Sequence, residues 1–172
     1  VGKSTLFNAL AGTRLAVVHN TPGTTRDRLV ARVSWNGISF ILVDTGGLAL
    51  DTEGDLEGKV QAQVQVALEE ADHLLFLTDA ATGLNPEDME AANLLRRQGQ
   101  QVTLASNKCE GPWNELASAE FYRLGLGHPF PVSALHNLGI GDLMDQVVAQ
   151  LPAMEPEKDQ QEVLKLALVG RP

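Results

Sequence analysis

Short apolar runs of the kind that form strands alternate along this chain with longer runs that carry apolar residues at helical spacing. Six runs are strand-like, namely 29–35, 39–44, 73–79, 101–107, 130–133 and 163–169. Five runs predict helices, namely 3–11, 56–71, 86–98, 113–124 and 141–151. Because strands and helices alternate in this way, we expect an α/β fold with a mostly parallel sheet.

Local signals set the ends of several of these elements. Asn36 and Gly37 separate the first two strands, and both tolerate the positive φ that a two-residue type I′ hairpin requires. We therefore expect these two strands to be antiparallel and the others parallel. Asn85 before Pro86 is typical of a helix start, and Gly99 is typical of a helix end.

Composition narrows the class of protein. A chain of 172 residues can bury a core without disulfides or a structural metal. The net charge of -9 predicts that this domain does not bind nucleic acid or an anionic membrane by itself. Cys109 is the single cysteine, which excludes an internal disulfide and favours a reducing compartment. With no signal peptide and no apolar run near the roughly 20 residues of a spanning helix, we expect a cytoplasmic protein.

The first expected helix opens with a possible phosphate-binding sequence. Residues 2–5 read Gly-Lys-Ser-Thr, the second half of the motif G-x-x-x-x-G-K-[ST]. Gly2 lets main-chain N–H groups approach phosphate oxygens, Lys3 neutralises phosphate charge, and Ser4 can bind Mg²⁺. The first half of the motif does not precede these residues, and four residues alone also match by chance.

Two further motifs suit a nucleoside triphosphate with magnesium. Asp44 ends an apolar strand and is followed by Thr-Gly-Gly, so its carboxylate can hold Mg²⁺ through water while a glycine N–H of this motif can meet a γ-phosphate. Thr25 lies in the polar connection 12–28, where a threonine can reach Mg²⁺ when a γ-phosphate is present. The stretch 45–55 is a second long polar connection, and loops of this length are often functional. An ordinary turn remains the alternative for each motif.

Two motifs after later strands suit a guanine base. Residues 107–110 read Asn-Lys-Cys-Glu and resemble N-K-x-D. A carboxylate at Glu110 can accept from guanine N1–H and the exocyclic amine, a donor pair that adenine lacks, while Asn107 contacts another edge. Glu110 keeps the charge of the usual aspartate on a longer arm. Residues 133–135 read Ser-Ala-Leu and resemble the segment whose main chain supports the base. A polar turn remains the alternative for both.

The order of these motifs is more informative than any one of them. Three follow expected strands, and α/β sheets bind their ligands beyond the carboxyl ends of the strands. Their joint occurrence predicts a GTP-binding domain, and the segments 44–47 and 107–110 argue against a nucleoside or protein kinase.

The chain resembles the Era-like, translation-factor-related GTPases. Within them it is most similar to the first G domain of the Der (EngA) family, bacterial tandem GTPases of ribosome assembly. The matching segments are 2–10 (GKSTLFNAL), 21–28 (TPGTTRDR), 42–47 (LVDTGG) and 166–172 (LALVGRP). The resemblance implies a P-loop GTPase fold with a six-stranded, mostly parallel sheet flanked by helices. It also implies GTP hydrolysis with Mg²⁺, and the large ribosomal subunit as a partner of the full-length protein.

The resemblance assigns roles to the matching positions. The implied nucleotide-binding residues are Gly2, Lys3, Ser4, Thr5, Asp44, Gly47, Asn107, Lys108, Glu110, Ser133 and Ala134. The implied metal-binding residues are Ser4, Thr25 and Asp44, and the implied catalytic residues are Lys3, Thr25 and Gly47.

Hydrolysis is expected to be slow. Leu48 follows the segment 44–47, where Ras-type enzymes place a glutamine that orients water, and a leucine cannot do this by hydrogen bonding. The resemblance implies hydrolysis assisted by potassium, so K⁺ is a second expected cation. Two alternatives stay open: a module that binds nucleotide with negligible turnover, and a fragment that is inactive in isolation.

The resemblance also divides the chain. It implies a G domain over 1–151 that lacks its first strand, a linker over 152–162, and the first strand and phosphate-loop start of a following G domain over 163–172. We expect 163–169 to fill the place of the missing strand in this chain. Leu166 and Leu168 would then be buried beside Val43 and Leu75, with 170–172 near Val1.

Overall fold

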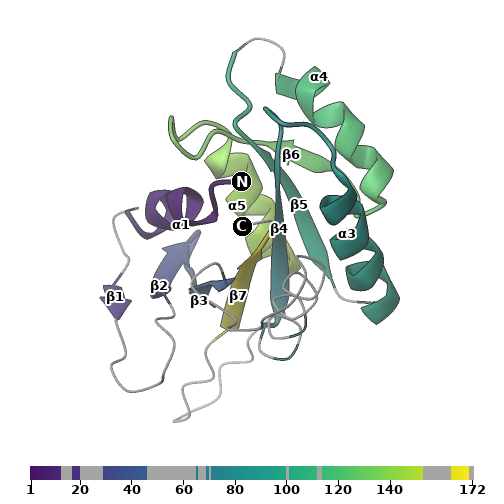
Figure 1. Cartoon of the computed structure of the whole chain (residues 1–172). Helices are drawn as coiled ribbons and strands as arrows, with labels where there is room; N and C mark the ends of the chain where they lie inside the picture. Colours follow the sequence, from purple (N-terminus) through teal and green to yellow (C-terminus); the bar gives the residue numbers. More distant parts are fainter. Residues whose placement is uncertain are drawn as a thin grey trace, which may run out of the picture.

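The computed structural model describes residues 1–12, 17–19, 29–45, 65, 69, 71–99, 101–111, 114–152 and 164–170. One sheet with the strand order β1-β2-β3-β7-β4-β5-β6 forms the centre of the fold (Figure 1). Its strands are β1 Val17–His19, β2 Leu29–Trp35, β3 Ile38–Asp44, β4 His73–Asp79, β5 Val102–Asn107, β6 Pro129–Pro131 and β7 Leu164–Val169. The described helices are α1 Lys3–Ala11, α3 Pro86–Gln98, α4 Asn114–Ser118, η2 Ala119–Leu124 and α5 Ile140–Gln150. Among these residues no helix has the length and hydropathy to cross a membrane.

The α/β fold and its mostly parallel sheet are as predicted. The β2–β3 pair is antiparallel, and its turn has φ of 49° at Asn36 and 82° at Gly37, both in the left-handed region of the expected hairpin. The pairs β3–β7, β7–β4, β4–β5 and β5–β6 are parallel. All six expected strands are present. The additional short strand β1 lies in the stretch 12–28, which we expected to be a connection, and it pairs antiparallel with the outer edge of β2.

Strand β7 occupies the central position that we expected for it. It pairs in parallel with β3 on one side and with β4 on the other, with Leu166 opposite Leu42 and Leu168 opposite Leu75. Both leucines are 0% exposed. Gly170 follows, and a Cβ on it would lie 3.3 Å from a side-chain carbon of Val1. The prediction for 163–169 is therefore confirmed, while Arg171 and Pro172 lie outside the described residues.

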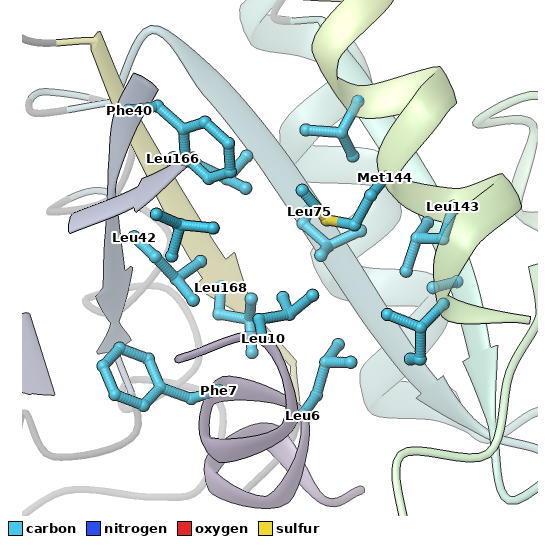
Figure 2. Packing of buried hydrophobic residues seen from close by; sticks show 14 of the residues in the cluster. Leu6, Phe7, Leu10, Phe40, Leu42, Leu75, Leu143, Met144, Leu166 and Leu168 are labelled. Carbon is cyan, nitrogen blue, oxygen red and sulfur yellow. The ribbon is translucent and has the colours of Figure 1, made fainter. Parts of the chain in front are cut away.

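The core consists of one hydrophobic layer on each face of the sheet. Side chains of α1 and α5 pack with alternate residues of β3, β7 and β4 on one face (Figure 2). The other face packs against α3 and η2. Successive residues of β7 point to opposite faces, so Leu166 and Leu168 belong to the first layer while Ala167 and Val169 belong to the second. A strand buried on both faces must be apolar throughout, as this segment nearly is.

The helices differ from expectation at a few ends. The side chain of Asn85 accepts from the Asp88 N–H at 2.9 Å and Gly99 has φ of 67°, so both predicted ends of α3 are confirmed. The single helix expected over 113–124 is instead α4 followed by the 3₁₀-helix η2, which ends at Gly125 with φ of 64°. The helix expected over 56–71 falls almost entirely outside the described residues.

Candidate functional site

The first helix of the chain starts where a phosphate would be held. Gly2 precedes α1 with φ of 91°, a conformation that favours glycine, and a Cβ there would lie only 2.6 Å from Nδ2 of Asn107. The first N–H groups of a helix have no partner within the helix, and the helix dipole makes this end positive. The predicted phosphate-binding residues 2–5 therefore form a helix N-terminus suited to an anion. Ser4 and Thr5 are exposed there.

Lys3 is positioned by the other end of the chain. It is only 6% exposed, and its Nζ donates a hydrogen bond to the main-chain oxygen of Gly170 just beyond β7. Burial lowers the pKa of Lys3, and the negative charge of Asp44 opposes that shift. Because β7 lies between β3 and β4, the carbonyl of Gly170 reaches the start of α1. The start of α1, where the predicted phosphate-binding residues lie, is thus linked to the main chain just beyond β7.

Asp44 and Ser4 lie together at the carboxyl end of β3. Asp44 is 0% exposed, and Ser4 Oγ donates to its Oδ2 at 3.0 Å. The next residue, Thr45, donates its hydroxyl hydrogen to the main-chain oxygen of Leu168 in β7. A hydroxyl and a carboxylate are hard oxygen donors of the type that Mg²⁺ prefers. These two members of the predicted metal set therefore fit a magnesium ion.

Asn107 connects the candidate phosphate and base segments. Its Nδ2 donates to the main-chain oxygen of Val1 at 2.8 Å, and its Oδ1 accepts from the Ala134 N–H at 2.9 Å. Asn107 is buried at the carboxyl end of β5; its bond with Ala134 is buried and its bond to Val1 is partly buried. One amide side chain thereby joins the loops that begin at Val1, Asn107 and Ser133. The predicted base and phosphate motifs are brought to one edge of the sheet.

Glu110 and Ser133 also meet, as the prediction of a shared base site requires. Ser133 is 1% exposed, and its hydroxyl donates to Oε1 of Glu110 at 3.4 Å. Nε2 of His136 lies 3.5 Å from the same carboxylate oxygen. The Glu110 side chain is 48% exposed, which leaves its carboxylate open to a ligand. Cys109, which directly precedes Glu110, is buried, and burial raises the pKa of its thiol. It is therefore not an exposed nucleophile.

Asp79 belongs to this site and was absent from the predicted set. It ends β4 directly opposite Asn107 of β5, and its Oδ2 lies 2.7 Å from Nζ of Lys108. Burial by itself raises the pKa of Asp79, but the hydrogen bond and positive charge of Lys108, with the Ala81 N–H, lower it overall. The signal in the sequence was an aspartate that ends an apolar run, as Asp44 does.

Two of the predicted site residues cannot be placed. Thr25 and Gly47, and with them Leu48, lie outside the described residues. Their proposed roles stay predictions.

Comparison with known proteins agrees with this geometry. The family model described as "50S ribosome-binding GTPase" matches residues 1–108. The chain belongs to this family. Its curated relatives include GTPase Der of Moorella thermoacetica, 50% identical over 172 residues, and GTPase Der of Clostridium novyi, 42% identical over 172 residues. Both matches cover 100% of this chain and 39% of the relative, so the chain spans about two fifths of these GTPases.

Solved structures of similar fold are cytosolic domains of FeoB. The domain from L. pneumophila has a TM-score of 0.62 at 22% identity, over 91% of this chain and 68% of that one. The domain of the T. maritima FeoB iron transporter in a GDP form has a TM-score of 0.58 at 23% identity, over 90% of this chain and 60% of that one. These likenesses support the P-loop GTPase fold of this family member.

Proposed function

We propose that this chain is a GTP-binding and GTP-hydrolysing switch domain of a bacterial GTPase that acts in assembly of the large ribosomal subunit. The observation that carries the proposal is the pair of hydrogen bonds that the buried side chain of Asn107 makes with Val1 and Ala134. They hold the phosphate loop, the base loop and its supporting segment at one edge of the sheet. Membership of the 50S ribosome-binding GTPase family and the relatedness to GTPase Der support the same function.

On the phosphate side, Gly2 and the N–H groups of 3–5 would hold the phosphates, with Lys3 supplying positive charge. A lysine whose pKa is lowered by burial gains a favourable partner when a phosphate arrives. Mg²⁺ would be held by Ser4 and Asp44, and by Thr25. The cation would neutralise charge that develops on the phosphates. Gly47 would contact the γ-phosphate, and with Lys3 and Thr25 it makes up the proposed catalytic set.

On the base side, Glu110 would accept from guanine N1–H and the 2-amino group. The Nδ2 of Asn107 carries two hydrogens, and one of them bonds to Val1, so the second can donate to a guanine acceptor. Lys108 would pack on the base, and Ser133 with Ala134 would support it. A site built from such polar groups rejects adenine, because the wrong base leaves buried groups unpaired.

Turnover is expected to be slow without an added factor. Leu48 leaves open the second candidate function, a module that binds nucleotide with negligible intrinsic hydrolysis. In the switch enzyme, potassium would serve as an additional positive charge near the phosphates. A phosphate-release assay in potassium and in sodium buffers separates the two functions. Potassium-stimulated release supports the switch enzyme, and no release above the protein-free rate in either buffer supports the binding module.

Within the full-length protein we propose the division given by the sequence. Residues 1–151 would be the G domain, 152–162 a linker, and 163–172 the start of a second G domain, which is a partner in cis. The large ribosomal subunit would be the other partner, and the bacterial cytoplasm the location. The 39% coverage of GTPase Der leaves room for further domains.

The decisive experiment is a binding titration of this 172-residue chain with GDP, GTP and ATP in the presence of Mg²⁺. We expect binding of both guanine nucleotides and ATP binding weaker by on the order of 10⁴-fold. Equal affinity for ATP and GTP would refute base recognition through 107–110. Absence of binding by all three would leave the chain as the inactive fragment considered above.

A further inference from the structure

A buried carboxylate lies where the proposed function requires phosphates to bind. Asp79 ends β4, and its side chain is 3% exposed. The α-ammonium group of Val1, at the start of the predicted phosphate-binding segment, lies 3.6 Å from its Oδ2 and forms an ion pair with it. A negative charge near phosphates weakens their binding unless a cation compensates it, and the compensation must be close because buried charges are poorly screened. Asp79 therefore needs a cationic partner closer than the Val1 ammonium for the site to work.

Lys108 is that partner. Its Nζ lies 2.7 Å from Oδ2 of Asp79, the distance of a strong charge-assisted hydrogen bond. Lys108 follows Asn107, whose position in β5 is opposite Asp79 in β4, so the strand register brings the two together. The second carboxylate oxygen of Asp79 accepts from the Ala81 N–H at 3.1 Å, which keeps the carboxylate in this orientation.

The main-chain conformation of Lys108 also indicates that contacts hold this residue in place. Its φ of 65° is in the left-handed region, which residues other than glycine and asparagine seldom adopt. Such a conformation persists where surrounding contacts hold it. The ion pair with Asp79 is a contact of the Lys108 side chain that can do so, and it places the ammonium group beside the carboxylate that Val1 also contacts.

We propose that Asp79 is a positioning residue of the nucleotide site, whose buried carboxylate holds Lys108 between the base loop and the phosphate loop. This proposal rests on the GTP binding proposed above. Lys108 in turn neutralises Asp79, so that the phosphates meet no net negative charge there. The ion pair between Asp79 and Lys108 therefore links the position of the base loop to the charge beside the phosphate loop.

The test is a set of binding titrations with GDP and GTP on the full 172-residue chain. The variants are Asp79→Asn, Lys108→Met and the double variant. Asparagine keeps the shape and the acceptor for Ala81, and methionine keeps an unbranched stem without the charge. Glu120→Gln, at an exposed residue of η2, is the control for loss of one negative charge.

We expect Asp79→Asn to weaken GDP and GTP binding roughly tenfold, and Lys108→Met to weaken both more, on the order of a hundredfold. The double variant should bind more tightly than Lys108→Met alone, because it removes a carboxylate whose charge only the more distant Val1 ammonium still opposes. A residue with only a structural role would not produce this rescue. Glu120→Gln should bind like the unmodified chain.

Unchanged affinity of Asp79→Asn would overturn the proposal, and so would a double variant that binds no better than Lys108→Met. If Lys108→Met does not fold, the double variant must fold and bind, and its failure to do either counts against the proposal. Thermal unfolding of each variant checks the fold. If the unmodified chain binds neither GDP nor GTP, the proposed function itself has failed and this inference fails with it.

Discussion

The buried side chain of His73 makes the free energy of unfolding of this chain depend on pH. The size of this dependence follows from the shift in the pKa of His73. It lies at the start of β4, is 0% exposed, and its Nε2 is 2.8 Å from Oγ1 of Thr103. Thr103 donates its own hydrogen to Gln150, so its oxygen accepts from the Nε2–H of His73. Nδ1 is buried without a hydrogen-bond partner in the described structure. A second proton would therefore have no acceptor, and burial lowers the pKa of His73 from 6.5 to about 4.

The sign of the effect follows from these two pKa values. Between about pH 6.5 and pH 4 the unfolded chain binds a proton at His73 that the folded chain does not bind. This contribution to stability is therefore complete above about pH 6.5 and is lost as the pH falls. At 1.36 kcal/mol for each pKa unit, the loss is about 2 kcal/mol at pH 5 and about 3 kcal/mol at pH 4.

The assay is denaturant unfolding of the unmodified chain and of His73→Gln between about pH 7.5 and pH 4. Carboxylates titrate in both proteins, so the difference between the two unfolding free energies isolates His73. We expect this difference to fall by about 3 kcal/mol over the range. His136→Gln, at a half-exposed histidine, is the matched control. Parallel curves for the unmodified chain and His73→Gln would refute the reasoning, because His73 would then have the same proton affinity in both states.

Three further predictions concern the site and the central strand. Glu110→Ala should bring ATP and GTP affinity close together while Glu110→Asp keeps the preference for GTP, as measured by competitive titration; a preference retained in the alanine variant would move base recognition elsewhere. Lys3→Ala should weaken the binding of GDP and GTP alike, whereas Thr25→Ala should reduce the rate of phosphate release more than the affinity for GDP. A normal rate of phosphate release by Thr25→Ala would assign the metal role to another residue. Leu168→Ala should lower the free energy of unfolding by about 2–5 kcal/mol in denaturant titration, because Leu168 is 0% exposed in the core layer that packs against α1 and α5. A loss below about 1 kcal/mol would mean that β7 contributes little to stability.

Local sequence was sufficient for most elements and for the identity of the site motifs. The Asn36-Gly37 turn, the Asn85 cap and the Gly99 end of α3 are decided by the conformations that these few residues allow, so a short window of sequence predicts them. The motifs at Asp44 and Asn107 could be recognised because each begins at the last residue of a largely apolar strand. Parallel strands carry such residues to one edge of the sheet whatever the details of packing.

What the sequence could not determine were features that depend on pairing between distant segments. The strand β1 pairs with backbone groups at the outer edge of β2, which lies elsewhere in the chain. The 3₁₀ form of η2 could not be predicted, because the spacing of its apolar residues suits an α-helix equally well. The partner of Asp79 was not predictable either, since Lys108 reaches it only because β4 and β5 are neighbours in register.

By itself the sequence determined the α/β class, the hairpin and the helix caps, since each depends on residues that lie close together in the chain. It also determined the order of the predicted nucleotide-binding motifs. Tertiary structure alone decided how those motifs meet. The bonds of Asn107 to Val1 and Ala134 span three separate segments, and the bond of Lys3 to Gly170 joins the two ends of the chain. Such contacts depend on the assembled sheet, because the carbonyl of Gly170 reaches Lys3 from the end of β7, which lies between β3 and β4.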